Sequence, residues 1–81
     1  MYLTVDLDGL DPSVVPSVGN PEPGGLGWYE TVELVKELAR RKRLVGMDIV
    51  ELRPIEGDVR GQVAAARLLH HVLAYIAAFG L

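Results

Sequence analysis

Residues Thr4–Pro12 read TVDLDGLDP, and the expected architecture follows from how this segment begins and ends. Polar and apolar side chains alternate from Tyr2 to Asp8, which is the period of a half-buried β-strand. We predict a strand over residues 2–8. In that strand Asp6 and Asp8 share one face, with their Cα atoms roughly 6.5–7 Å apart. The strand is therefore expected to end in two carboxylates that point the same way.

Two carboxylates aimed at one place repel each other unless a cation lies between them. Oxygen ligands of this kind suit Mg²⁺, Mn²⁺ or Ca²⁺. Asp6 and Asp8 are thus candidate metal ligands. The alternative is that one of them caps the turn that follows, as Asp11 before Pro12 is expected to do. Both interpretations stay open from the spacing alone.

The rest of the chain is predicted to form a loop, a helix, a strand and a second helix. Residues 9–27 hold four of the five prolines and indicate a long but stiffened loop. Residues 28–41 place apolar side chains at helical spacing, with Glu early and Arg late. We expect a strand over 44–51 and a helix over 59–79, with Asp58 as the N-cap.

The order strand, helix, strand predicts a right-handed crossover between two parallel strands. The fold class is therefore α/β, with βαβα order and parallel strands. Ligands of open α/β sheets bind beyond the carboxyl ends of such strands. Glu51 closes the second strand as Asp8 closes the first, so the three carboxylates are expected at one edge of the sheet. The alternative for Glu51 is a solvated strand end.

The helix over 59–79 is apolar around most of its circumference, and such helices are normally buried. A chain of 81 residues, 49% of them hydrophobic, has too little other structure to cover it. We therefore expect a homo-oligomer formed through this helix. We do not expect a membrane span, because the near-apolar stretch 68–81 is short and interrupted by His70 and His71.

A net charge of −3 gives no reason to expect nucleic acid or an anionic membrane surface as a partner. The basic run Arg40–Arg43 is placed where it complements the end of a helix dipole. The chain has no cysteine, which excludes disulfides and thiolate zinc sites. The start of the chain lacks the basic and apolar regions of a signal peptide, and we expect a cytoplasmic protein.

Two blocks of the sequence carry a resemblance to a known family. Thr4–Pro12, followed by the loop that ends in Pro23–Leu26 (PGGL), resembles the ureohydrolase signature S-x-D-x-D-x-x-D-P with its proline-rich loop. Val45–Pro54 resembles the family's V-G-x-D-x-V-E-x-x-P strand. The chain is thus similar to the C-terminal segment of ureohydrolases, the arginases and agmatinases. The resemblance implies a βαβα fragment of a three-layer α/β/α arginase-like fold.

The resemblance also implies a chemistry. Ureohydrolases use two Mn²⁺ ions bridged by a hydroxide, which attacks a guanidinium carbon and releases urea. Asp6 and Asp8 match two of the metal ligands, and Glu51 matches the carboxylate that pairs with the guanidinium of the substrate. Glu22 in the NPEP stretch and the GWYE sequence that begins at Gly27 resemble agmatinases more than arginases, which implies a substrate such as agmatine.

Two positions depart from the family pattern. Asn20 stands where threonine is usual, and Arg53 stands where a small or polar residue is usual. The family's G-G-D-H and D-A-H-x-D type motifs, which supply the other ligands, do not occur in these 81 residues. We therefore expect the isolated chain to be inactive. The alternatives are a non-catalytic, self-associating module and another metal-dependent hydrolase with a D-x-D strand end.

Overall fold

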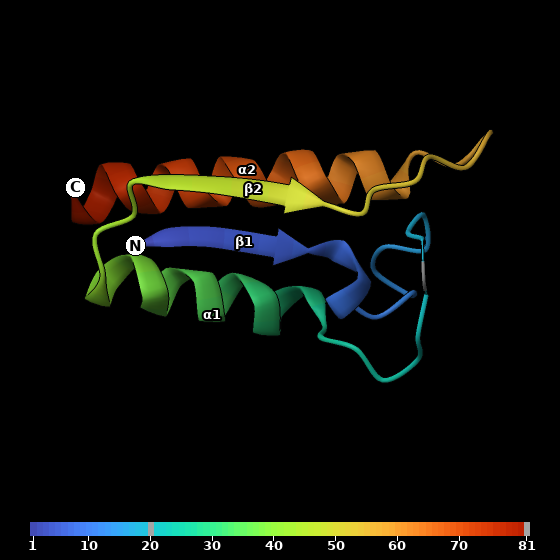
Figure 1. Cartoon of the computed structure of the whole chain (residues 1–81), viewed down its shortest axis with the longest axis horizontal. Helices are drawn as coiled ribbons and strands as arrows, with labels where there is room; N and C mark the ends of the chain where they lie inside the picture. Colours follow the sequence, from blue (N-terminus) through green and yellow to red (C-terminus); the bar gives the residue numbers. More distant parts are fainter. Residues whose placement is uncertain (20, 81) are drawn as a thin grey trace.

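The computed structural model describes residues 1–19 and 21–80. Asn20, noted above as a departure from the family pattern, lies outside the described residues. The elements run in the order strand, short 3₁₀ helix, helix, strand, helix (Figure 1). In chain order they are β1 (Tyr2–Asp6), η1 (Leu7–Gly9), α1 (Trp28–Arg41), β2 (Gly46–Val50) and α2 (Arg60–Phe79).

The two strands form a parallel sheet, as predicted. Their register pairs Tyr2 with Gly46 at one end and Asp6 with Val50 at the other. Because the strands are parallel and in register, both carboxyl ends lie at one rim of the sheet. This rim is also where the chain leaves β1 into the long loop (Figure 1).

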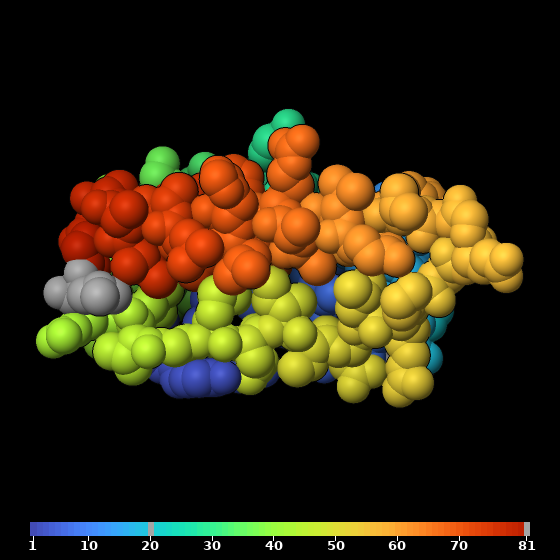
Figure 2. All heavy atoms as spheres, turned by 90° about the horizontal axis from the view of Figure 1, so that it is seen from above, coloured from blue at the N-terminus to red at the C-terminus, as the bar shows by residue number. Residues whose placement is uncertain are grey.

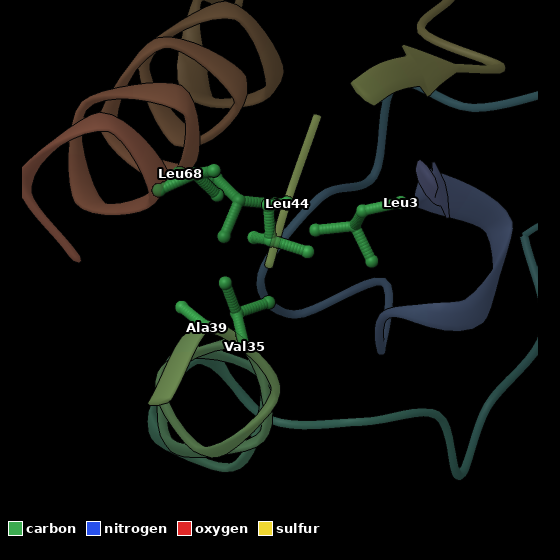
Figure 3. Close-up of a cluster of buried hydrophobic side chains, with 6 residues drawn as sticks. Leu3, Val35, Ala39, Leu44 and Leu68 are labelled. Carbon is green, nitrogen blue, oxygen red and sulfur yellow. The ribbon is translucent and has the colours of Figure 1, made fainter. Parts of the chain in front are cut away.

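Both helices pack on the same face of the sheet. Their apolar stripes meet Leu3 of β1 and Leu44, which precedes β2, and Figure 3 shows these side chains pointing toward one another. The space-filling view shows α2 lying along β2 (Figure 2). This main core consists of Leu3, Val35, Ala39, Leu44, Leu68 and Val72.

A second cluster of buried side chains lies beneath the loop. Leu7, Leu10, Val15 and Val18 are each less than one tenth exposed and pack against Val5, Leu52 and α2. The loop is therefore a packed part of the fold. That agrees with the stiffness that its prolines predicted.

Three predicted boundaries differ from the structure. The strand predicted over 2–8 ends at Asp6, because the chain turns into η1 and Asp6 Oδ1 accepts a hydrogen bond from the Asp8 N–H at 2.9 Å. The strand predicted over 44–51 is shorter, Gly46–Val50. The helix predicted over 28–41 is observed over the same residues.

The third difference concerns the start of α2, which was predicted at residue 59 with Asp58 as its N-cap. The helix begins at Arg60, and the N-cap position falls on Val59. Asp58 still supports this end, because its Oδ1 accepts from the Arg60 N–H at 3.0 Å. Hydrogen bonds from the Arg60 guanidinium and N–H hold the pKa of Asp58 at about 2, below its usual 3.8.

Helix α2 is long and apolar enough to cross a membrane by length and composition, which the sequence analysis did not expect. Core helices of soluble proteins pass the same test. Here Leu68 and Val72 are fully buried against α1 and the sheet. Only 11% of the apolar stretch is buried, so α2 packs one side against the core and leaves apolar side chains such as Leu69 and Leu73 exposed.

Gly61 lies where the first turn of α2 approaches the loop. A Cβ on this residue would overlap Ser17 Oγ and lie 2.9 Å from Leu52 Cδ1. Ser17 is itself buried, and its Oγ has no hydrogen-bond partner among the described residues. The glycine weakens the helix by about 1 kcal/mol relative to alanine. The close approach explains why it is there.

We expect Gly61→Ala to destabilise the chain, because crowding a well-packed site costs typically about 1–3 kcal/mol and outweighs the gain in helix propensity. Urea unfolding monitored by circular dichroism measures the difference. Gly9→Ala is the control, since a Cβ there meets nothing within 4 Å. Equal midpoints for the two variants would contradict the close-approach explanation.

Candidate functional site

Asp6 and Asp8 are brought together by a turn of 3₁₀ helix rather than by the pleat of a strand. Asp6 is the N-cap of η1, and its Oδ1 accepts from the Asp8 N–H. The turn-capping alternative is therefore correct for Asp6. It does not exclude a metal, because a carboxylate has two oxygens and about four lone-pair sites. Both residues lie at the carboxyl end of β1.

Glu51 follows β2 directly and has a left-handed backbone conformation, with φ of +71°. This region is unfavourable for a residue with a Cβ and costs of the order of 1–3 kcal/mol. The two residues that follow it are held by the loop: the Arg53 N–H donates to the Ser17 carbonyl at 2.7 Å, and Val18 pairs with Leu52. Strain of this kind is concentrated at functional sites.

The three predicted site residues therefore lie at one rim, but they do not form one compact cluster. Asp6 pairs with Val50, the residue before Glu51, across a strand spacing of roughly 4.8 Å. Within residues 1–19 and 21–80, no group of three or more His, Cys, Asp and Glu side chains is placed to hold a metal ion. The roles of Asp6, Asp8 and Glu51 stay predictions.

Asp11 holds the loop at this rim. Its carboxylate accepts hydrogen bonds from the Ser13 N–H at 3.0 Å, the Ser13 hydroxyl at 2.5 Å and the Gly24 N–H at 3.0 Å. These bonds, the one from the Ser13 hydroxyl first, lower the pKa of Asp11. The sequence predicted the turn at Asp11 and Pro12. It gave no sign of the contact with Gly24.

Gly25 lets the far end of the loop return to β1. A Cβ on it would lie 2.7 Å from the Asp11 nitrogen and 2.7 Å from the Leu10 carbonyl carbon. The backbones pair here, since the Leu26 N–H donates to the Gly9 carbonyl at 2.9 Å. The glycines of the PGGL stretch therefore serve a turn and a close backbone approach.

Asp48 belongs to the second sequence block, Val45–Pro54, and no role was predicted for it. It lies on the sheet face opposite the helices, where its Oδ2 accepts from the Tyr2 hydroxyl at 3.1 Å and the Thr4 hydroxyl at 3.4 Å. The bond to Asp48 raises the pKa of Tyr2. The alternation of Tyr2, Thr4 and Asp6 was the signal that could have found this polar face.

The mid-helix histidines do not join the rim. His71 packs edge-on against Trp28, with ring centroids 5.9 Å apart, and lies 5.8 Å from the ring of Tyr75. His70 is exposed on α2. His71 therefore has a packing role.

The structure is thus an α/β segment with acidic side chains at the carboxyl-end edge of its two parallel strands. Comparison with known proteins then identifies the family. The model of the Arginase family matches residues 1–75. The chain belongs to the arginase family.

Its relatives include ureohydrolases of known name. The chain is 43% identical over 75 residues to the N(1)-aminopropylagmatine ureohydrolase of Synechocystis sp., covering 93% of this chain and 24% of that protein. It is 45% identical over 73 residues to the enzyme of the same name from Thermus thermophilus, covering 90% and 25%. The crystal structure of agmatine ureohydrolase of Thermoplasma volcanium superposes with a TM-score of 0.83 at 39% identity, covering 91% and 25%.

These matches confirm the predicted α/β, arginase-like fold with parallel strands. The chain spans about a quarter of the length of the relatives that it matches. It therefore corresponds to one segment of their fold.

We expect the contribution of Asp11 to stability to depend on pH. Its folded pKa is lowered, so the contribution is complete above the unfolded value of about 3.9 and is lost as the pH falls through the folded value. Urea unfolding should show a clear loss of stability in Asp11→Ala at pH 6 that shrinks below pH 4. Glu33→Ala, at an exposed position of α1, is the matched control. A loss for Asp11→Ala that stayed constant down to pH 2 would refute the assignment.

Proposed function

We propose that this chain supplies part of the active site of a manganese-dependent ureohydrolase of agmatinase type, which hydrolyses a guanidino compound and releases urea. The observation that carries the proposal is the rim of the parallel sheet. There Asp6 ends β1, Asp8 lies in η1 just beyond it, and Glu51 follows β2 in a strained conformation. Membership of the arginase family supports the same chemistry.

Asp6 and Asp8 would contribute carboxylate ligands to Mn²⁺. Their oxygen donors suit this hard cation, and the bond from the Asp8 N–H to Asp6 Oδ1 fixes the backbone between them. The bound metal lowers the pKa of a coordinated water and so supplies the nucleophile. Asp6 and Asp8 can supply two of the carboxylate ligands that such a site needs. The remaining ligands would come from residues outside these 81.

Glu51 would bind the guanidinium of the substrate. A carboxylate accepts two parallel N–H bonds from this planar group, which fixes both its position and its orientation. The left-handed backbone of Glu51, together with the loop contacts of the two residues that follow it, would keep the carboxylate in place before the substrate arrives. A carboxylate that is already in position holds the guanidinium in the geometry of the reaction, and this lowers the activation barrier for hydrolysis.

Agmatine or a related cationic guanidino compound is the substrate that we propose. The support is twofold: the NPEP stretch around Glu22, and relatives named agmatinase and N(1)-aminopropylagmatine ureohydrolase. We propose a cytoplasmic setting without a nucleic acid or membrane partner, since the net charge is −3 and Leu68 and Val72 of α2 pack in the core.

We expect substoichiometric Mn²⁺ to broaden the amide NMR signals of residues 6–9 of the 81-residue chain more than any others, because paramagnetic relaxation is strongest beside the ion. Asp6→Asn with Asp8→Asn should abolish this selectivity. Glu33→Gln, which removes one charge from α1, should leave it intact. Broadening that is strongest elsewhere would exclude Asp6 and Asp8 as ligands.

With agmatine and Mn²⁺, the same preparation should release no urea, because the described carboxylates form no complete metal cluster. Turnover by the 81-residue chain would contradict the proposed dependence on further ligands.

A second, non-catalytic candidate is self-association through α2. This helix exposes Leu69 at 42% and Leu73 at 57%. Together with Val45 and Met47 these side chains line an apolar groove of about 430 Å³ between α2 and the strand β2. Exposed apolar surface of this kind favours a protein partner, and a second copy of the chain is the partner that we propose.

We expect sedimentation to show a dimer or larger species at micromolar concentration, and Leu73→Glu to shift it toward monomer by placing a charge in the groove. His70→Glu adds a charge to α2 at another exposed position and should not. A wild-type chain that stays monomeric would exclude this candidate.

A further inference from the structure

The side chains of Arg53 and Glu51 both approach Gly19 of the loop. An ideal Cβ on Gly19 would lie 3.0 Å from Glu51 Oε2 and 3.2 Å from Arg53 Nε. The guanidinium of Arg53 is therefore close to the carboxylate that is proposed to receive the guanidinium of the substrate. Gly19 leaves the space that both side chains use.

Two backbone contacts with the loop fix the position of the Arg53 main chain. Its N–H donates to the Ser17 carbonyl at 2.7 Å, and the preceding residue, Leu52, pairs with Val18. The guanidinium itself is exposed and has no ion-pair partner in the described part of the chain, unlike that of Arg60, which pairs with Asp58 at 2.7 Å. Arg53 is thus a cation held near Glu51 without neutralising it by direct contact.

We propose that Arg53 is a specificity-determining residue that competes with guanidino ligands for Glu51. This inference rests on the proposed function of Glu51. Arg53 carries the same planar, permanently charged group as the substrate, with the same fork of donors. A guanidinium ligand that binds Glu51 must either displace the Arg53 guanidinium or bind beside it. In the second case the two positive charges repel each other and weaken binding.

The consequence is a site that holds simple guanidinium ions weakly. Contacts to the rest of a larger guanidino compound must compensate for the competition. Arg53 therefore acts through Glu51 on binding and takes no part in the chemical step. Replacing its charge should strengthen the binding of small guanidinium probes.

The test is an NMR titration of the 81-residue chain with methylguanidine, followed at the amides of Gly19 and Glu51. We expect Arg53→Gln to bind the probe about three- to tenfold more tightly than the wild type. Arg53→Lys keeps the charge and should stay within about twofold of the wild type. Arg67→Gln removes one charge from the exposed face of α2 and controls for net charge.

Equal affinity of wild type and Arg53→Gln, with a probe that still needs Glu51, overturns the competition and leaves the proposed function standing. Tighter binding by Arg53→Lys or by Arg67→Gln to the same degree overturns it as well. If Glu51→Gln leaves the shifts unchanged, or if no variant binds, the guanidinium-binding role of Glu51 fails and this inference fails with it. Dispersed amide spectra of each variant confirm folding.

Discussion

The parallel pairing of β1 with β2 determines where the helices and the acidic side chains of this chain lie. It aligns Asp6 with Val50, so the chain leaves both strands at the same rim. Helix α1 must then cross over one face, and α2 packs beside it on that same face. The acidic side chains that follow the strands are thereby delivered to a common edge. An antiparallel pair would separate them by the length of a strand.

The sequence predicted this arrangement well because most of it is local. The helical spacing of apolar residues predicted both ends of α1 correctly, and the crossover rule predicted the parallel sheet. The error at the end of β1 is instructive. Alternation continues through Leu7, which is 1% exposed and would be buried in either conformation. The pattern therefore could not show that the Asp6 side chain bonds the backbone two residues on and ends the strand.

Close contacts between segments that are far apart in the chain could not be predicted from the sequence. Gly61 reads as a weak point in a helix until Ser17, which lies far from it in the chain, is placed beside it. Gly25 reads as a turn residue until its contact with the Asp11 backbone is seen. The left-handed conformation of Glu51 could not be foreseen either, because residues other than glycine rarely adopt it.

The loop, more than the sheet, determines where the Glu51 carboxylate lies. A strained backbone persists only where its surroundings outweigh the cost. Here the surroundings are the Val18 and Leu52 pair and the Arg53 to Ser17 hydrogen bond, both made by loop residues that the second apolar cluster holds in place. The same contacts bring Arg53 beside Gly19. The position of the carboxylate and that of its neighbouring cation therefore have one structural cause, and a change in loop packing would move both.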